Sequence, residues 1–350
     1  MTRSVVTGEQ PAQSVVTDRM GIGGIGFDRL MAVLCCGFVG GIYLDGWAHD
    51  HGRVDQSFFR PWHALLYAAY FACALVLLGA VIINRRRSQS WRTAIPQGYE
   101  LALLGVPLFL AAGEGDLVWH TLFGFEVGIE PLLSPSHLLL AFSGVLIQSS
   151  PLRAAWRRAD PVASHGWGTL LPALLSLLAV FSVATFFTEF AHPFINTRVV
   201  AAARSSDEQS WGVASVLLQA SILMGFVLLA LRRWRLPLGT FTLILTLNGA
   251  LMSVLLDQQR LIPGVFLAGA FADLLYLVVQ PAAGRVTALR LFAFCVPLVY
   301  FLSYFVTLML TGGTNWSIHL WLGASVMTGI IGLGLSYLLA PPASPVTYAG

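Results

Sequence analysis

Two stretches of the chain place a carboxylate and two imidazoles at matching positions. In each, an aspartate is followed four residues later by a histidine and, further along, by a Pro-x-His step. The residues are Asp45, His49, Pro61 and His63 in the first stretch, and Asp116, His120, Pro135 and His137 in the second. Positions i and i+4 share one face of a helix, and proline favours the first helical turn. Each stretch therefore predicts a helical hairpin that directs two imidazoles and one carboxylate to a common centre.

This set of donors is typical of a metal site. Neutral imidazole combined with carboxylate suits copper, zinc or iron, whereas an all-oxygen set would favour magnesium or calcium. Two histidines and one carboxylate are also the ligands of non-haem iron oxygenases. Spacing alone does not choose the metal. The alternative interpretation is a duplicated hairpin whose polar ends only hydrogen-bond to each other.

The elements that carry these residues are predicted to be membrane helices. The 350-residue chain is 56% hydrophobic and 11% charged, with a mean hydropathy of +0.74. Apolar runs long enough to cross a bilayer, about 20 residues each, recur along its length. We therefore expect an all-α integral membrane protein with about ten transmembrane helices, the first four of which form the duplicated hairpins. The expected spans are 29–47, 61–83, 99–119, 133–149, 168–190, 211–231, 237–256, 261–280, 288–310 and 317–339.

The order of these runs also predicts how the chain is organised. We expect a flexible tail over 1–26, the duplicated hairpin region over 27–150, additional transmembrane helices over 151–340 and a C-terminal tail over 341–350. The bilayer is then the chain's first partner. An oligomer is compatible with this organisation, whereas a nucleic-acid partner is not expected because the arginines follow the membrane topology and form no basic groove.

Arginines cluster in alternate connections between the spans, around residues 85–92, 153–158, 232–235 and 285–290, and in the N-terminal tail. Since cytoplasmic loops carry an excess of basic residues, both termini are expected in the cytoplasm. The protein would lie in a bacterial-type inner membrane. The histidine stretches fall in the other connections, so the metal sites are expected toward the extracytoplasmic side.

Further polar residues near the same side are candidates for supporting roles. Glu126 is a candidate for orienting an imidazole, or belongs to a wetted turn. Glu189 and His192 end the fifth span and either add donors from a third helix or form an ordinary interfacial pair. His51 is expected to be solvated, or to substitute as a ligand. Asp273 lies within an apolar run, either as a protonated hydrogen-bond partner between helices or as part of a proton path.

Over about residues 40–145 the chain resembles the C subunit of the particulate methane monooxygenase and ammonia monooxygenase family. The matching residues are Asp45, His49, Arg53, Phe59, Pro61 and His63 in the first hairpin, and His120, Thr121, Glu126, Pro135 and His137 in the second. The family has asparagine where this chain has Asp116. The resemblance implies copper at both hairpins, activation of O₂ and hydroxylation of a small apolar substrate. It also implies other membrane subunits and a cupredoxin-like subunit as partners.

We therefore expect a copper-binding membrane protein, with a copper-dependent monooxygenase or one of its subunits as the leading hypothesis. No catalytic residue beyond the metal ligands is assigned. The alternatives are non-enzymatic metal handling, in transport, sensing or assembly, and a structural subunit of a membrane complex. Asp273 is the one strong mid-span candidate for a transport path.

Overall fold

The structure, a computed structural model, is built from helices throughout the part of the chain that it describes. It describes residues 21–53, 61–87, 90–124, 126, 128–158 and 166–341. Most of the predicted tail over 1–26 and all but the first residue of the tail over 341–350 therefore lie outside the described residues. So do Phe59 of the first hairpin and the arginines of the tail before residue 21.

The helices follow one another with short connections. In chain order they are α1 (Gly24–Asp50), α2 (Pro61–Arg86), α3 (Trp91–Ala94), α4 (Glu100–Phe123), α5 (Glu130–Leu133), α6 (Pro135–Gln148), α7 (Ser150–Arg157), α8 (Trp167–Phe186), η1 (Glu189–Ala191), α9 (Thr197–Val200), α10 (Ser206–Arg233), α11 (Thr240–Leu255), η2 (Gln259–Leu261), α12 (Ile262–Val279), α13 (Val286–Thr311) and α14 (Ile318–Leu339). Each of the ten predicted spans overlaps a helix of this series, and the fourth, 133–149, overlaps α6, which reaches a spanning length only together with α7.

Nine helical segments within the described ranges are long and apolar enough to cross a membrane, which confirms a multi-pass membrane protein. The segment predicted as the seventh span, 237–256, is shorter. Its helix α11 has 16 residues, or about 24 Å at 1.5 Å per residue, against a bilayer core of about 30 Å. Gly239 has a left-handed backbone (φ 90°) immediately before α11, which is why the helix begins later than the hydropathy alone predicts.

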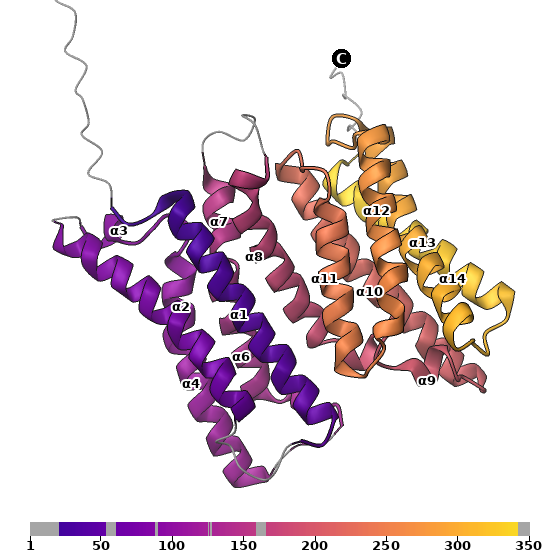
Figure 1. Cartoon of the computed structure of the whole chain (residues 1–350), viewed down its shortest axis with the longest axis horizontal. Helices are drawn as coiled ribbons and strands as arrows, with labels where there is room; N and C mark the ends of the chain where they lie inside the picture. Colours follow the sequence, from indigo (N-terminus) through magenta and orange to yellow (C-terminus); the bar gives the residue numbers. More distant parts are fainter. Residues whose placement is uncertain are drawn as a thin grey trace, which may run out of the picture.

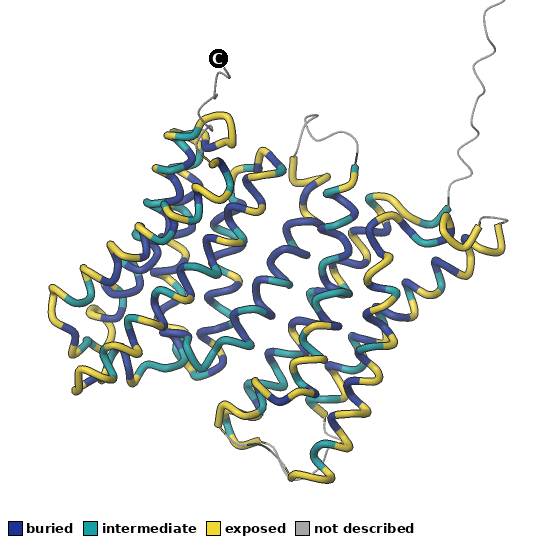
Figure 2. The backbone as a smooth tube through the Cα atoms, turned by 180° about the vertical axis from the view of Figure 1, so that it is seen from behind, coloured by how far each residue is buried: buried dark blue, intermediate teal, exposed yellow. Residues whose placement is uncertain are grey.

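The long helices lie side by side and run alternately in opposite directions (Figure 1). Helices α1, α2, α4 and α6 form one side of the molecule, α10 to α14 form the other, and α8 lies between them (Figure 1). Helix α1 packs against both α2 and α8. The buried positions form the inner faces of the helices, while exposed positions follow the outer faces and the ends (Figure 2).

Two clusters of buried apolar side chains stabilise this arrangement. The smaller one joins α1, α2 and α4 through residues such as Phe38, Tyr70 and Phe109. The larger one extends from α8 to α14 and includes Val39 and Tyr43 of α1. Helix α1 therefore contributes one face to each cluster, and it ties the hairpins to the rest of the chain.

The arginine-rich connections lie at one end of the bundle. The ends of α2, α7 and α10 and the start of α13 are all at the end where α1 begins (Figure 1). The histidine stretches belong to the opposite helix ends, at the end of α1, the start of α2, the end of α4 and the start of α6. The clusters of arginines are thus separated from the paired histidines along the bundle axis.

Candidate metal centre

The first group of candidate ligands lies where α1 ends and α2 begins. Asp45 and His49 lie one turn apart on α1, and His63 is in the first turn of α2. Asp45 Oδ2 is 3.3 Å from His63 Nε2 and 3.8 Å from His49 Nε2. One donor atom from each residue can be chosen so that all lie within 4.8 Å of one another. The structure thus brings the three residues together, as their spacing predicts.

Helix packing one turn away holds this group in place. A methyl group added at Gly41 would lie 2.8 Å from Leu66 Cα. The absence of a side chain at Gly41 therefore lets the backbones of α1 and α2 approach closely. Asp45 follows Gly41 by one helical turn, and His63 precedes Leu66 by about one turn. The close approach consequently sets the distance between the carboxylate and the facing imidazole.

The second group lies where α4 ends and α6 begins. Asp116 Oδ2 is 3.3 Å from His120 Nε2, and Asp116 Oδ1 is 3.5 Å from His137 Nδ1. These three residues also offer donor atoms that all lie within 4.8 Å of one another. The side chain of Asp116 is only 3% exposed. This places a carboxylate inside a membrane helix bundle, which is costly and typical of a functional position.

Two serines and a glutamate lie within hydrogen-bonding distance of the second group. Ser136 Oγ donates to Asp116 Oδ1 at 2.8 Å, and Ser134 Oγ lies 2.6 Å from His137 Nδ1. The His120 ring faces Asp116 through Nε2, and its other nitrogen, Nδ1, is 3.1 Å from Glu126 Oε2. A carboxylate on one ring nitrogen directs the other nitrogen toward a metal and raises its basicity. Glu126 therefore lies where the orienting role predicted from sequence requires it.

The two groups have closely similar geometry. The ring centroids of His49 and His63 are 5.9 Å apart at an interplanar angle of 73°. Those of His120 and His137 are also 5.9 Å apart, at 67°. The groups differ in the exposure of the histidine that follows the aspartate by one turn: the side chain of His49 is 40% exposed, whereas that of His120 is 10% exposed.

Both groups fit a metal ion of the transition series. Donor atoms on one ion lie about 3–4 Å apart, because each bond to nitrogen or oxygen is about 2.0–2.2 Å long. The Asp–His distances of 3.3–3.8 Å match this separation without rearrangement of the helices. Three protein donors would leave further coordination positions open, as in catalytic rather than structural sites.

Tyr67, which was not singled out from the sequence, is under the electrostatic influence of both groups. It follows His63 by one turn on α2, and the carboxylates of both Asp45 and Asp116 interact with it electrostatically. Its hydroxyl fits against α4 because residue 113 is glycine: an added methyl group there would lie 2.4 Å from Tyr67 Oη. The i+4 spacing from His63 is the sequence signal that could have identified it.

His51 does not belong to either group. It follows the end of α1, where its Nδ1 is 2.8 Å from the Trp47 carbonyl and its Nε2 is 2.9 Å from Asp257 Oδ2. The hydrogen bond to Asp257 raises the pKa of His51, and the same contact lowers the pKa of Asp257. His51 is therefore neither simply solvated nor a substitute ligand, and instead it connects α1 to the segment after α11.

Glu189 and His192 are not members of either group of candidate ligands. Burial, followed by the nearby carboxylate of Asp50, raises the pKa of Glu189 to about 8. His192 is fully enclosed: burial lowers its pKa to about 3, and its Nδ1 accepts a hydrogen bond from the backbone N–H of Phe194. The expected donors from a third helix are thus placed in separate surroundings, because η1 turns the chain away after α8.

Asp273 is a hydrogen-bond partner between helices. Its carboxylate accepts from the backbone N–H groups of Phe241 and Thr242 and from the Thr242 hydroxyl, at 2.6–3.2 Å. All three donors belong to the first turn of α11. These contacts give Asp273 a structural role in joining α12 to α11.

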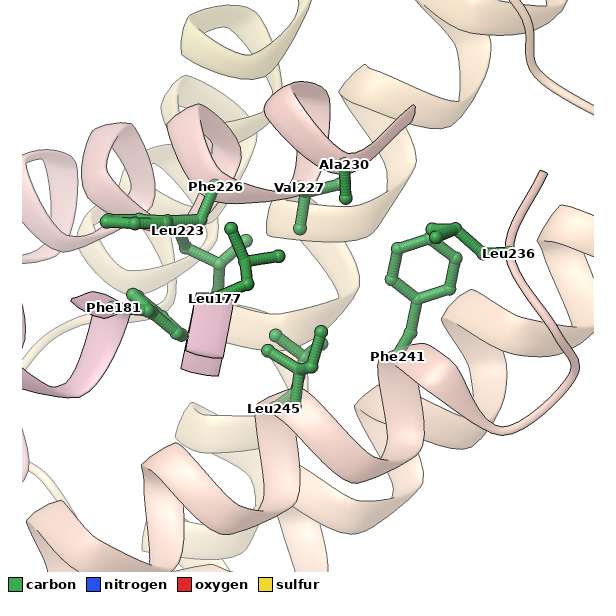
Figure 3. A pocket seen from close by; sticks show the side chains of 10 residues that line it. Leu177, Phe181, Leu223, Phe226, Val227, Ala230, Leu236, Phe241 and Leu245 are labelled. Carbon is green, nitrogen blue, oxygen red and sulfur yellow. The ribbon is translucent and has the colours of Figure 1, made fainter. Parts of the chain in front are cut away.

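A small apolar cavity lies in the other half of the bundle (Figure 3). Its volume is about 10 Å³, and its walls are side chains of α8, α10, α11 and the segment before α11, including Phe181, Phe226 and Phe241. The space is that of about one water molecule, and an apolar space of this kind stays dry. Because its walls come from other helices than α1, α2, α4 and α6, it is not a substrate pocket of the histidine groups.

Comparison of the chain with protein-family models, with curated proteins and with solved structures finds no match in any of the three.

Proposed function

We propose that the chain is a membrane metalloprotein with two copper centres, one held by Asp45, His49 and His63 and the other by Asp116, His120 and His137. The observation that carries this proposal is the convergence of two equivalent donor sets, each with distances that suit one ion. The two hairpins are then two versions of one metal-binding unit. Copper is preferred because imidazole-rich sites bind it most strongly among the divalent metals, ahead of zinc and iron.

The activity that this arrangement best supports is oxygen-dependent hydroxylation of a small apolar substrate at the membrane. A bound redox metal would supply the oxygen chemistry. The protein's own residues would do the rest: Glu126 orients His120, Ser136 orients Asp116, and the open coordination positions leave room for a further ligand. The exposed apolar side chains around α4 and α6, such as Leu117 and Leu138, face the lipid from which an apolar substrate would arrive.

Tyr67 is proposed to couple the two centres. The carboxylates of Asp45 and Asp116 both act electrostatically on its hydroxyl, so a change of charge at either donor set would be felt by the same side chain. In this scheme Tyr67 is a positioning residue. We expect Tyr67→Phe to keep both ions and to make the spectrum of each centre independent of whether the other is filled.

Orientation belongs to the same proposal. The arginine-rich end of the bundle would face the cytoplasm of a bacterial-type inner membrane, and the donor sets would lie toward the extracytoplasmic side. Partner subunits, including an electron-donating cupredoxin-like protein, would then reach the donor sets from outside. Cysteine accessibility in intact cells, with single cysteines introduced at Gly52 and at Arg87 of a cysteine-free variant, measures this directly.

Of the alternatives, a transporter is the less favoured. A path to the cytoplasm needs polar side chains along the bundle, and Asp273, the mid-span candidate, is fully engaged in joining α12 to α11. Metal storage or sensing, or a structural subunit of a larger complex, uses the same donor sets without turnover.

The test is the metal content of the detergent-purified protein. We expect about two copper equivalents per chain for the wild type, about one each for His49→Ala and for His120→Ala, and almost none for the double variant. His319→Ala, which removes an exposed histidine of α14, serves as the matched control and should keep both ions. Equal copper, zinc and iron contents in the wild type and the double variant would overturn the proposal. Consumption of O₂ with a reductant and a short alkane then separates the enzyme from metal storage.

A further inference from the structure

A large cavity lies at the arginine-rich end of the bundle, far along the chain from the donor sets. Its volume is about 560 Å³, and its walls come from the end of α10, the segment before α11 and the connection between α12 and α13. We call it the arginine pocket. Its characteristic side chains are Arg232, Arg233, Arg235, Arg285, Trp234 and Tyr276, and among the residues that the structure describes no aspartate or glutamate lines it.

The shape of the pocket follows from the chain's path after α10. Trp234 leaves the helix with an extended backbone (φ −128°, ψ 152°). Trp234 and Leu236 are both buried, at 5% and 6% exposure, and alternate side chains of an extended segment point to opposite sides. Arg235 is therefore directed away from the core. The backbone N–H of Leu236 donates to Tyr276 Oη at 2.9 Å, which fixes this wall of the pocket to α12.

The opposite wall is a tight turn. Gln280 ends α12 with a left-handed backbone (φ 49°), and Arg285 donates to both the backbone carbonyl and the side-chain oxygen of Gln280 at 3.2–3.4 Å. An isolated antiparallel β-bridge between the backbones of Ala282 and Arg285 closes the turn. Both walls are thus held by hydrogen bonds that do not depend on a ligand.

The four guanidinium groups are not equally engaged. Arg233 donates to the carbonyl oxygens of Trp156 and Arg158, and Arg285 is held by Gln280. Arg232 and Arg235 are exposed, and within the described part of the chain neither has a salt bridge or a hydrogen bond. Two guanidinium groups with unused donors, in a pocket whose described lining holds no carboxylate, are suited to the paired oxygens of a phosphate group.

The surroundings of the pocket indicate where that phosphate comes from. Leu277 lines the pocket, and Leu274 and Val278 of the same helix are 61% and 73% exposed. These side chains belong to a candidate membrane span, so they face lipid chains. The pocket therefore lies where headgroups and acyl chains meet, and basic pockets between membrane helices bind lipid headgroups in this position.

We propose that the arginine pocket binds the phosphate group of an anionic phospholipid, with Arg232 and Arg235 as its ligands and Leu277 and its neighbours along the acyl chains. An arginine excess at one membrane face accounts for the number of arginines there. It does not account for their convergence on a shared cavity next to an exposed apolar helix face. The inference is independent of the metal centres.

The test is native mass spectrometry of the delipidated, full-length protein in detergent, titrated with phosphatidylglycerol, with phosphatidylcholine or with inorganic phosphate. We expect one tightly held phosphatidylglycerol per chain and at least tenfold weaker binding by Arg232→Gln/Arg235→Gln. The matched control is Arg86→Gln/Arg92→Gln, which removes the same charge from exposed positions at the same end and should bind like the wild type. Arg235→Lys keeps the charge but loses the planar fork, so it should fall between the wild type and the double variant.

Equal phosphatidylglycerol binding by the wild type and the pocket variant overturns the proposal, as does an equal loss in the control variant. Displacement of the lipid by inorganic phosphate at comparable concentration assigns the pocket to free phosphate and overturns the lipid as ligand. Equal binding of phosphatidylcholine and phosphatidylglycerol also overturns the selectivity for an anionic lipid. Copper content, measured on the same samples, should be the same in all variants, so failure here is distinguishable from failure of the proposed metal centres.

Discussion

The orienting role of Glu126 offers the sharpest test of the second metal centre. The perturbation is Glu126→Gln, which keeps the size of the side chain and removes its charge. In the structure Glu126 Oε2 is 3.1 Å from His120 Nδ1, and both side chains are about 10% exposed. Loss of such a partner weakens metal binding by about 10–100-fold, because the imidazole becomes less basic and freer to rotate.

The structure places the expected effect at the low end of that range. The Gly124 carbonyl oxygen is 3.4 Å from the same nitrogen of His120, so it can accept the N–H once the carboxylate is gone. We therefore expect a loss of about tenfold, or about 1.4 kcal/mol. Glu126→Ala, which also removes the side chain that covers the ring, should lose more than Glu126→Gln.

The assay is a copper(I) titration against a chromophoric chelator, in a His49→Ala background so that only the second centre is measured. Glu114→Gln is the matched control, because it removes an exposed carboxylate from α4, the helix that carries Asp116 and His120, and should leave the affinity unchanged. An unaltered affinity in Glu126→Gln would refute the reasoning. So would an equal loss in Glu114→Gln, since the effect would then be one of overall charge.

Three further predictions concern other parts of the bundle. Gly41→Ala should separate α1 from α2, because its methyl group would lie 2.8 Å from Leu66 Cα. We expect thermal unfolding to show a loss of stability of about 1–3 kcal/mol and metal analysis to show copper loss at the first centre alone. Copper loss at both centres would contradict this prediction. Glu189 has its pKa raised to about 8 by burial and by Asp50, so the stability it contributes is full below its ordinary pKa and is lost as pH rises through about 8, at up to about 1.4 kcal/mol per pH unit. The unfolding temperature of the wild type should therefore fall relative to that of Glu189→Gln between about pH 5 and 8. Parallel curves of unfolding temperature against pH would contradict this prediction. Asp273→Ala should lower the free energy of unfolding by about 2–3 kcal/mol, because it leaves buried donors of α11 unpaired. Asp273→Asn keeps an acceptor oxygen and should lose less stability. An unchanged free energy of unfolding in Asp273→Ala would exclude the structural role.

The helices were largely predictable from the sequence because a single physical quantity, the length of apolar runs, decides them. The predicted span 61–83 is α2 (Pro61–Arg86), and 317–339 is α14 (Ile318–Leu339). The exception, α11, begins at a left-handed glycine, which a hydropathy average does not detect. The grouping of Asp45 with His49 was likewise predictable, since an i, i+4 pair on a helix is a local relation.

Relations between distant segments were not predictable in the same way. The spacing of Glu189 and His192 is that of a ligand pair, but η1 and the turn after it send the two side chains into different surroundings. His51 finds its partner 206 residues away, and no periodicity signals such a pairing. Tyr67 shows the intermediate case, because its helical face follows from His63, whereas its contact with α4 depends on the absence of a side chain at Gly113.

The unequal burial of the two donor sets has a kinetic consequence. His49 is 40% exposed, whereas Asp116 is 3% exposed and enclosed by hydrogen bonds. An ion would leave and re-enter the set of Asp45, His49 and His63 quickly, while exchange at the set of Asp116, His120 and His137 would wait for the hairpin of α4 and α6 to open. A brief pulse of chelator should accordingly yield a half-loaded chain that keeps its ion at Asp116. That species would allow each hairpin to be studied in turn without altering a single residue.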